Sequence, residues 1–212
     1  MTREIRAFQF EMRAERDEKH GDHITGVPIV YEAKTDIAGW YEEKIAAGAL
    51  DGADLRDVRF LVNHNASMIP LARSRNNNEN STMQMSVEED GLHIRVDLDT
   101  EGNAEARSLY SAIRRGDISG MSFAFRVDSD SWEDLDTDYP KRTITGIGKV
   151  FEVSAVTWPA YDQTSLEARS NANALDSAAS VLESARAEKR AAAERRSLAE
   201  SILKKLEENR DV

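Results

Sequence analysis

One stretch of this chain of 212 residues reads Ile118-Ser119-Gly120-Met121-Ser122-Phe123-Ala124-Phe125. Small or hydroxylated residues at positions 120, 122 and 124 alternate with bulky apolar residues at 121, 123 and 125. In a β-strand the two sets point to opposite faces, so one face is predicted to pack and the other to carry Ser122 among small neighbours. Such neighbours allow the close approach that an attacking Oγ requires. Most strand serines are only solvated or bonded to backbone, so catalysis needs support from elsewhere in the chain.

The pattern around this stretch predicts a mainly β fold with flanking helices, an α+β protein. Alternation predicts a hairpin whose turn is Glu89-Asp90-Gly91, and Asn103 is the expected N-cap of a helix that ends at Gly116. A loop is expected over 15–22, a short helix over 42–47 and an acidic connection over 128–140. The remaining strands are expected over 4–14, 24–31, 58–62 and 143–158.

The carboxyl-terminal part changes composition to Ala, Glu, Arg, Lys and Leu from Asn171 onward, which is typical of a long exposed helix. We therefore expect a folded domain over residues 1–168 and a charged helical tail over 169–212. The thin apolar stripe of the tail fits two interpretations equally, a partly frayed lone helix and a coiled segment that binds a partner.

Composition excludes several function classes. Apolar residues make up 40% and charged residues 32% of the chain, and no apolar run approaches the roughly 20 residues of a membrane helix. The first residues lack the apolar stretch of a signal peptide, so no export signal is expected. Without cysteine there is no disulfide, thiol nucleophile or Cys-based zinc site. A formal net charge of -11 argues against binding of nucleic acid through phosphate neutralisation and favours protein partners.

Serine hydrolysis needs a base and a group that orients it. His64 follows the apolar strand 58–62 between two asparagines, where the alternative is a turn histidine bonded to nearby backbone. Glu152 lies in the apolar segment 150–156 and should be paired if it is buried, the alternative being a solvent-facing side chain. Ser154 shares its face and is both a helper and a rival nucleophile, and Ser119 is a further rival.

The other histidines do not predict a metal site. His20 and His23 flank Asp22 in a segment expected to be solvated, and a metal interpretation there lacks a third well-placed ligand. His93 is expected on the polar face of the hairpin. We therefore expect neither a metal nor a cofactor.

Three segments together resemble the caudovirus prohead serine proteases, the maturation proteases of tailed bacteriophages. They are the strand leading to Asn63-His64-Asn65, the run 114–125 with Gly120-Met121-Ser122-Phe123, and the segment 151–161. The similarity covers roughly residues 5–165, with Gly-Val-Pro-Ile-Val-Tyr at 26–31 and the hairpin also fitting. Ala124 stands where the family often has glycine, and it is still small.

The resemblance implies a β-barrel wrapped by helices, as in the herpesvirus assemblins, and a serine endopeptidase. Carried over by motif, Ser122 is the nucleophile, His64 the general base and Glu152 the orienting acid. The implied substrates are scaffolding protein or the scaffolding segment of the major capsid protein, and the enzyme itself. The resemblance also implies an oligomer inside the procapsid in the bacterial host cytoplasm, with the portal as a further partner.

Two other functions are compatible with the sequence. One is a non-catalytic capsid scaffold or assembly protein that keeps the protease fold and uses its charged tail to engage capsid subunits. The other is a metal-dependent hydrolase built on the histidines, which the spacing supports least. Labelling with a serine-directed fluorophosphonate separates the protease from the scaffold protein, and inhibition by chelators would identify the hydrolase.

Overall fold

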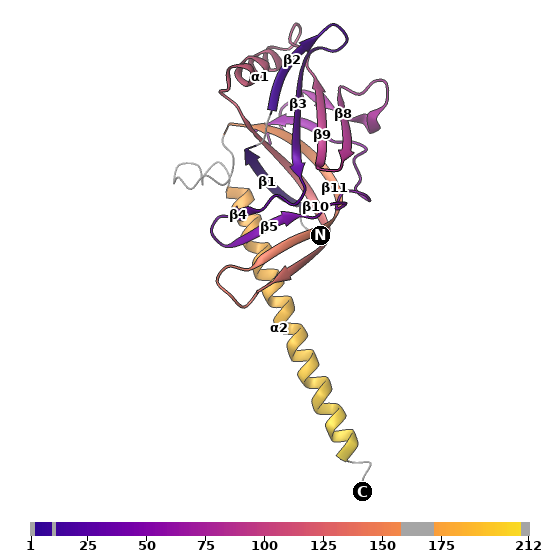
Figure 1. Ribbon diagram of the computed structural model, residues 1–212, viewed down its shortest axis with the longest axis vertical. Coiled ribbons are helices and arrows are strands. Elements are labelled where there is room, and N and C mark those ends of the chain that lie inside the picture. Colours follow the sequence, from indigo (N-terminus) through magenta and orange to yellow (C-terminus); the bar gives the residue numbers. More distant parts are fainter. Residues whose placement is uncertain (1–2, 10–11, 158–171, 209–212) are drawn as a thin grey trace.

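The computed structural model describes residues 3–9, 12–157 and 172–208. In these residues two β-sheets meet at an apolar core, and a long helix leaves the molecule at one end (Figure 1). The elements in chain order are β1 (Arg3–Gln9), β2 (Met12–Asp17), β3 (Gly21–Val30), β4 (Thr35–Ile37), β5 (Tyr41–Ile45), β6 (Arg59–Val62), β7 (Ala72–Arg73), the 3-10 turn η1 (Arg75–Asn77), β8 (Met83–Glu88), β9 (Gly91–Asp97), α1 (Ala104–Arg115), β10 (Gly120–Glu133), β11 (Lys141–Val156) and α2 (Ala172–Glu208).

The larger sheet has the strand order β1-β10-β11-β5-β4, with β6 and then β7 attached to β11. The first part of β11 pairs in parallel with β5, from Lys141 to Ile144, and its last part pairs in parallel with β6, from Glu152 to Ala155. Two short strands therefore share one edge of β11, while β1 covers the far side of β10.

The closed barrel implied by the resemblance is not found among the described residues. Neither sheet returns to its own first strand, because the long edge of β11 is shared by β5 and β6, and the sheet then ends at β4 and β7. The broader expectation, a mainly β fold with helices, is confirmed.

Three local predictions were wrong. The segment 42–47 was expected to be helical, but residues 41–45 form β5, whose side chains alternate between buried and half-buried. The acidic connection starts later than expected, because β10 continues to Glu133 through bulged pairing with β11. The loop expected over 15–22 begins as β2, which pairs with β3 in the second sheet.

The alternation predicted for 118–125 is confirmed, and its bulky residues form the packing face of β10. Met121, Phe123 and Phe125 are fully buried in the main core, against strands of the second sheet, which has the order β2-β3-β9-β8. Burial of each such side chain contributes roughly 1.5–3 kcal/mol to folding. The core thus fixes which face of β10 carries Ser122.

Helix α1 has the predicted ends. The Asn103 side chain accepts hydrogen bonds from the amides of Glu105 and Ala106, and Gly116 closes the helix with a left-handed φ of 80°. Its apolar face buries Leu109 and Ile113 in the core, so α1 is packed across one end of the sheets.

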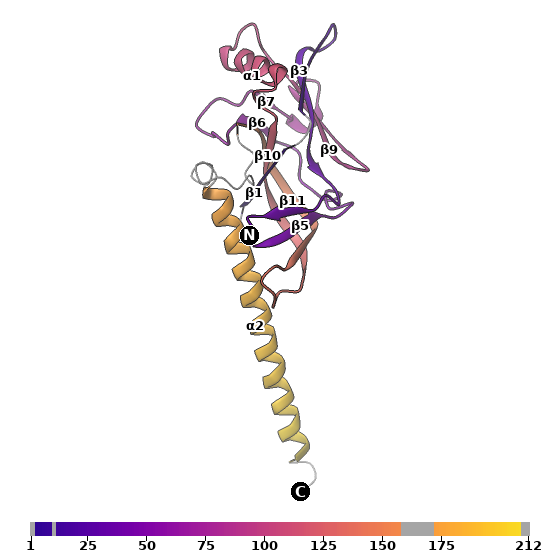
Figure 2. The same cartoon turned by 60° about the vertical axis from the view of Figure 1, so that its left-hand side comes forward.

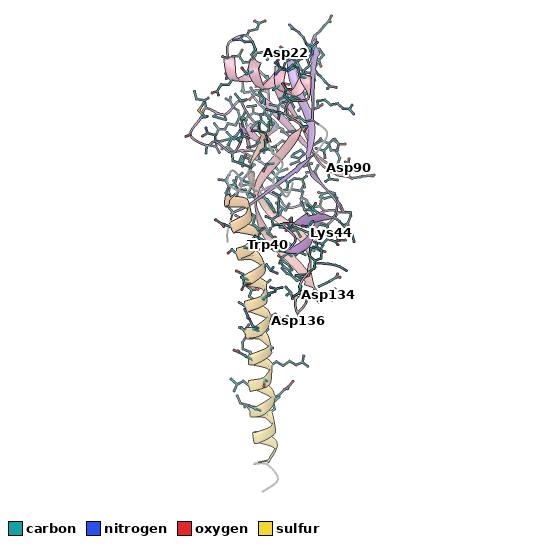
Figure 3. All side chains as sticks on the ribbon, turned by 90° about the vertical axis from the view of Figure 1, so that its left-hand side faces the viewer. Asp22, Trp40, Lys44, Asp90, Asp134 and Asp136 are labelled. Carbon is teal, nitrogen blue, oxygen red and sulfur yellow. The ribbon has the colours of Figure 1, made fainter. Side chains whose placement is uncertain are left out.

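The tail is a single helix over its described residues, and its first turns pack on the sheet. Ala178 and Leu182 are buried against Ile37 and Tyr41. Further along, Lys189 binds Asp136 in the β10–β11 connection at 2.5 Å, where Figure 3 shows Asp136 next to the helix. Leu198, Ile202 and Leu203 beyond this point are exposed. No described helix is long and apolar enough to cross a lipid bilayer.

Candidate active site

The turn after β6 places His64. Asn63 and His64 both have left-handed backbone, with φ values of 51° and 57°, and Asn63 Oδ1 accepts from the amide and hydroxyl of Thr157 at 3.0 and 2.9 Å. Asparagine and histidine adopt this conformation more readily than most residues, but it is uncommon and often marks a functional site. The turn is therefore tied to the end of β11 and directs the imidazole back along that strand.

Glu152 receives that imidazole. His64 Nδ1 lies 2.5 Å from Glu152 Oε1, and the Glu152 side chain is only 4% exposed against 21% for His64. When the carboxylate is ionised, the proton of the imidazole is held on Nδ1, so Nε2 is left as an acceptor. This is the tautomer that a general base needs.

Ser154 supports the pair from the same strand. Its hydroxyl donates to Glu152 Oε2 at 2.6 Å and accepts from the amide of His64 at 3.3 Å. Arg3 of β1 adds a third donor to Glu152 at 3.2 Å. The proton of the Ser154 hydroxyl is thus committed to a carboxylate, which favours its role as a helper over its role as a nucleophile.

Ser122 lies one strand further on. It is the direct cross-strand neighbour of Ser154, and it is fully buried. Its hydroxyl donates to the carbonyl oxygen of Arg6 in β1 at 2.8 Å, and no hydrogen bond joins it to His64. The strands concerned lie side by side in the order β6, β11, β10, β1. The structure thus brings His64 and Glu152 into contact and places Ser122 beside their supporting serine. Ser119 is exposed ahead of β10.

Sequence reasoning missed the role of β1. The Arg6 guanidinium is completely buried and binds Glu43 at 2.5 and 2.7 Å and Glu4 at 2.8 Å, while Arg142 binds both carboxylates. Burial raises the pKa of Glu43, but the two guanidinium groups outweigh it and hold that pKa below its ordinary value. This charged cluster anchors β1, whose carbonyl receives the Ser122 hydroxyl. Alternation around residues 4–6 was the available signal, but it does not identify the partner of Arg6, 37 positions away, or that of Glu4, 138 positions away.

The described residues offer one group that could ligate a metal, and it lies elsewhere. Glu88, Asp90 and His93 gather at the exposed β8–β9 turn, and His93 Nε2 lies 2.7 Å from Asp90. Asp90 projects from this turn in Figure 3. The hydrogen bond from His93 lowers the pKa of Asp90, so the contacts within the group account for its arrangement. His23, expected to be solvated, is instead buried at 5% exposure.

Two sequence comparisons relate the chain to phage prohead proteases. The sequence pattern of the family described as caudovirus prohead serine protease matches residues 8–177. The prohead protease of Enterobacteria phage HK97 is 26% identical over 121 residues, covering 57% of this chain and 48% of that protein, so the chain spans about half the length of this curated relative. Among solved structures, the capsid assembly protease of bacteriophage T4 matches with a TM-score of 0.42 and 18% identity, covering 74% of this chain and 99% of that one.

Proposed function

The chain belongs to the caudovirus prohead serine protease family, and we propose that it is a serine endopeptidase of phage prohead maturation. The observation that supports this most is the 2.5 Å contact between His64 and Glu152, formed by residues 88 positions apart. It supplies a base in the turn after β6, oriented by Glu152 of β11, the strand next to the one that carries Ser122.

In the proposed mechanism the Ser122 hydroxyl rotates away from the Arg6 carbonyl and gives its proton to His64 Nε2 as Oγ attacks the scissile carbonyl carbon. Glu152 stabilises the imidazolium that forms, and Ser154 holds Glu152 in place. His64 then protonates the leaving amine as the C–N bond breaks, which leaves an acyl group on Ser122. Water, deprotonated by His64, releases the acid and restores the hydroxyl.

The proposed substrates follow from the kind of protein to which the chain is related. We place its cleavage sites in scaffolding protein or in the scaffolding segment of the major capsid protein, and in the enzyme itself. The site of action is the procapsid in the host cytoplasm, where the enzyme acts as an oligomer with the portal as a further partner. The name of the phage HK97 relative, a prohead protease, supports this placement.

The test is co-expression of the full chain with the major capsid protein of the same phage, followed by measurement of intact masses. The wild-type chain should shorten the capsid protein or itself, and Ser122→Ala and His64→Ala should not. Diisopropyl fluorophosphate should add one diisopropylphosphoryl group to the wild-type protein alone, with loss of fluoride. Full proteolysis by Ser122→Ala would show that the nucleophile lies elsewhere.

A second function is favoured by one observation. Ser122 is fully buried and donates its proton to backbone and not to His64, which suits a non-catalytic assembly protein that keeps the protease fold. For that function the charged helix α2 would engage capsid subunits. A scaffold protein would remain unlabelled by the fluorophosphate at every pH. The protease would be labelled once the Ser122 hydroxyl rotates and β1, the strand that covers it, opens.

A further inference from the structure

A largely apolar cavity of about 530 Å³ lies directly beside the candidate base. It lies between α1 and the segment that joins β6 to β7, two elements that lie close together in Figure 2. Asn63 and Asn65, the two neighbours of His64, line it, and so does Ile118, four positions before Ser122. The cavity therefore adjoins both segments that supply the proposed base and nucleophile.

The rim of the cavity exposes apolar side chains. Ile69 is 82% exposed and Met68 is 44% exposed, although both line a cavity whose other walls include Leu61 and Leu109. Apolar side chains exposed around a concave apolar site are typical of a surface that a ligand covers. A ligand that covers these two side chains should present an apolar surface to them.

The cavity is within reach of a polypeptide bound at Ser122. Strands β6 and β10 are separated by β11 alone, which puts them roughly 10 Å apart at the usual spacing of about 4.8 Å between strands. An extended peptide advances about 3.3 Å per residue, so a side chain about one to three residues from the scissile bond reaches the opening.

The charge in the cavity limits which substrate side chains can bind there. Glu105, in the first turn of α1, is the one charged residue among the described residues that line it. A carboxylate entering the cavity would meet this like charge and lose its hydration, which disfavours Asp and Glu. A bulky hydrocarbon side chain meets neither cost.

We infer that this cavity binds a bulky apolar side chain of the polypeptide substrate, Leu, Ile, Met or Phe, within about three residues of the scissile bond. The inference rests on the proposed function and deepens it, because it assigns the residues that select the cleavage site. Selection arises because desolvation of the side chain in the cavity strengthens binding next to the reacting groups.

The experiment incubates the full chain with a peptide library made by digesting a bacterial proteome, and identifies cleavage sites by mass spectrometry. The wild-type enzyme should enrich Leu, Ile, Met and Phe at one fixed position and deplete Asp and Glu there. Ala112 lines the cavity from α1, and Ala112→Leu should fill it. This variant should cleave the best apolar peptide about 10- to 100-fold less efficiently, mainly through a higher KM.

Two further variants test whether the effect of Ala112→Leu comes from the cavity. Ser111→Leu adds the same side chain at an exposed position of α1 that does not line the cavity, and it should behave as wild type. Ile69→Asp alters only the exposed rim, so it should weaken cleavage of the apolar peptide without a folding defect. Labelling of Ser122 by diisopropyl fluorophosphate, which is too small to need the cavity, should stay unchanged in all three.

The outcomes separate the two proposals. Cleavage without an apolar preference, or an Ala112→Leu enzyme with wild-type selectivity, would overturn the inference and leave the protease in place. A wild-type chain that neither cleaves the library nor accepts the fluorophosphate would overturn the proposed function, and the inference with it.

Discussion

Replacement of Ser154 by alanine tests whether this serine positions the catalytic pair or is itself the nucleophile. The change removes the hydrogen bond to Glu152 at 2.6 Å and the acceptor of the His64 amide at 3.3 Å. A hydrogen bond to a charged group contributes about 1.5–3 kcal/mol, and the longer bond to the amide contributes less. If about 2 kcal/mol of this is lost in the transition state, the reaction of Ser122 should slow about 30-fold, since about 1.4 kcal/mol corresponds to tenfold.

The assay is the rate at which diisopropyl fluorophosphate adds to the full chain, followed by intact mass. Ser154→Ala should be labelled about 30-fold more slowly than wild type but to completion, because Ser122, His64 and Glu152 remain. Ser122→Ala should not be labelled at all. Ser86→Ala is the matched control, because the Ser86 hydroxyl donates to Glu88 at 2.8 Å, again two residues away, at the exposed end of β8. It should react at the wild-type rate.

Two labelling results would refute the proposed role of Ser154 as a positioning residue. A folded Ser154→Ala protein that accepts no label would identify Ser154 as the nucleophile. A Ser154→Ala protein that reacts as fast as wild type would show that its hydroxyl does not position Glu152 or His64. Circular dichroism of each variant checks that the fold is retained.

The other predictions concern stability. Glu43→Gln leaves the guanidinium groups of Arg6 and Arg142 undercompensated in a buried site, so the free energy of unfolding should fall by about 3–5 kcal/mol in guanidinium titrations; a loss below about 1 kcal/mol would contradict the buried cluster. Because the folded pKa of Glu43 lies below its ordinary value of 4.5, its ionisation stabilises the fold above that pH, and the contribution is lost as the pH falls through the folded pKa. The Tm should therefore be level above about pH 5 and fall in acid, more steeply in wild type than in Glu43→Gln. Asn103→Ala removes the cap of α1 and should cost about 1 kcal/mol, measured by thermal unfolding against Ser111→Ala as the exposed control.

Local patterns predicted the elements whose stabilisation is local. The hairpin of β8 and β9 and the capped helix α1 lie where alternation, the Asp-Gly turn and Asn103 predicted them. Each depends on side-chain periodicity and on hydrogen bonds between close neighbours, and both can be recognised along the chain.

The failed predictions share a physical cause. In β5, Tyr41, Glu43 and Ile45 all point inward, and the charged residue hides the alternation of a strand. Glu43 is tolerated there only because Arg6 and Arg142 come from other strands to neutralise it. The acidic end of β10 likewise becomes a strand because it pairs with β11, although its exposed charges are typical of a loop.

The sequence by itself determined which residues to consider at the site, Ser122, His64 and Glu152, and which face of β10 would pack, since these follow from alternation and from the family motifs. Only the tertiary structure decided how they are arranged. The pairing of β6 and β10 with the two sides of β11 brings His64 onto Glu152, inserts Ser154 between that pair and Ser122, and turns the Ser122 hydroxyl toward β1. Strand pairing joins residues about 90 positions apart, and such long-range contacts leave no periodic trace in the chain.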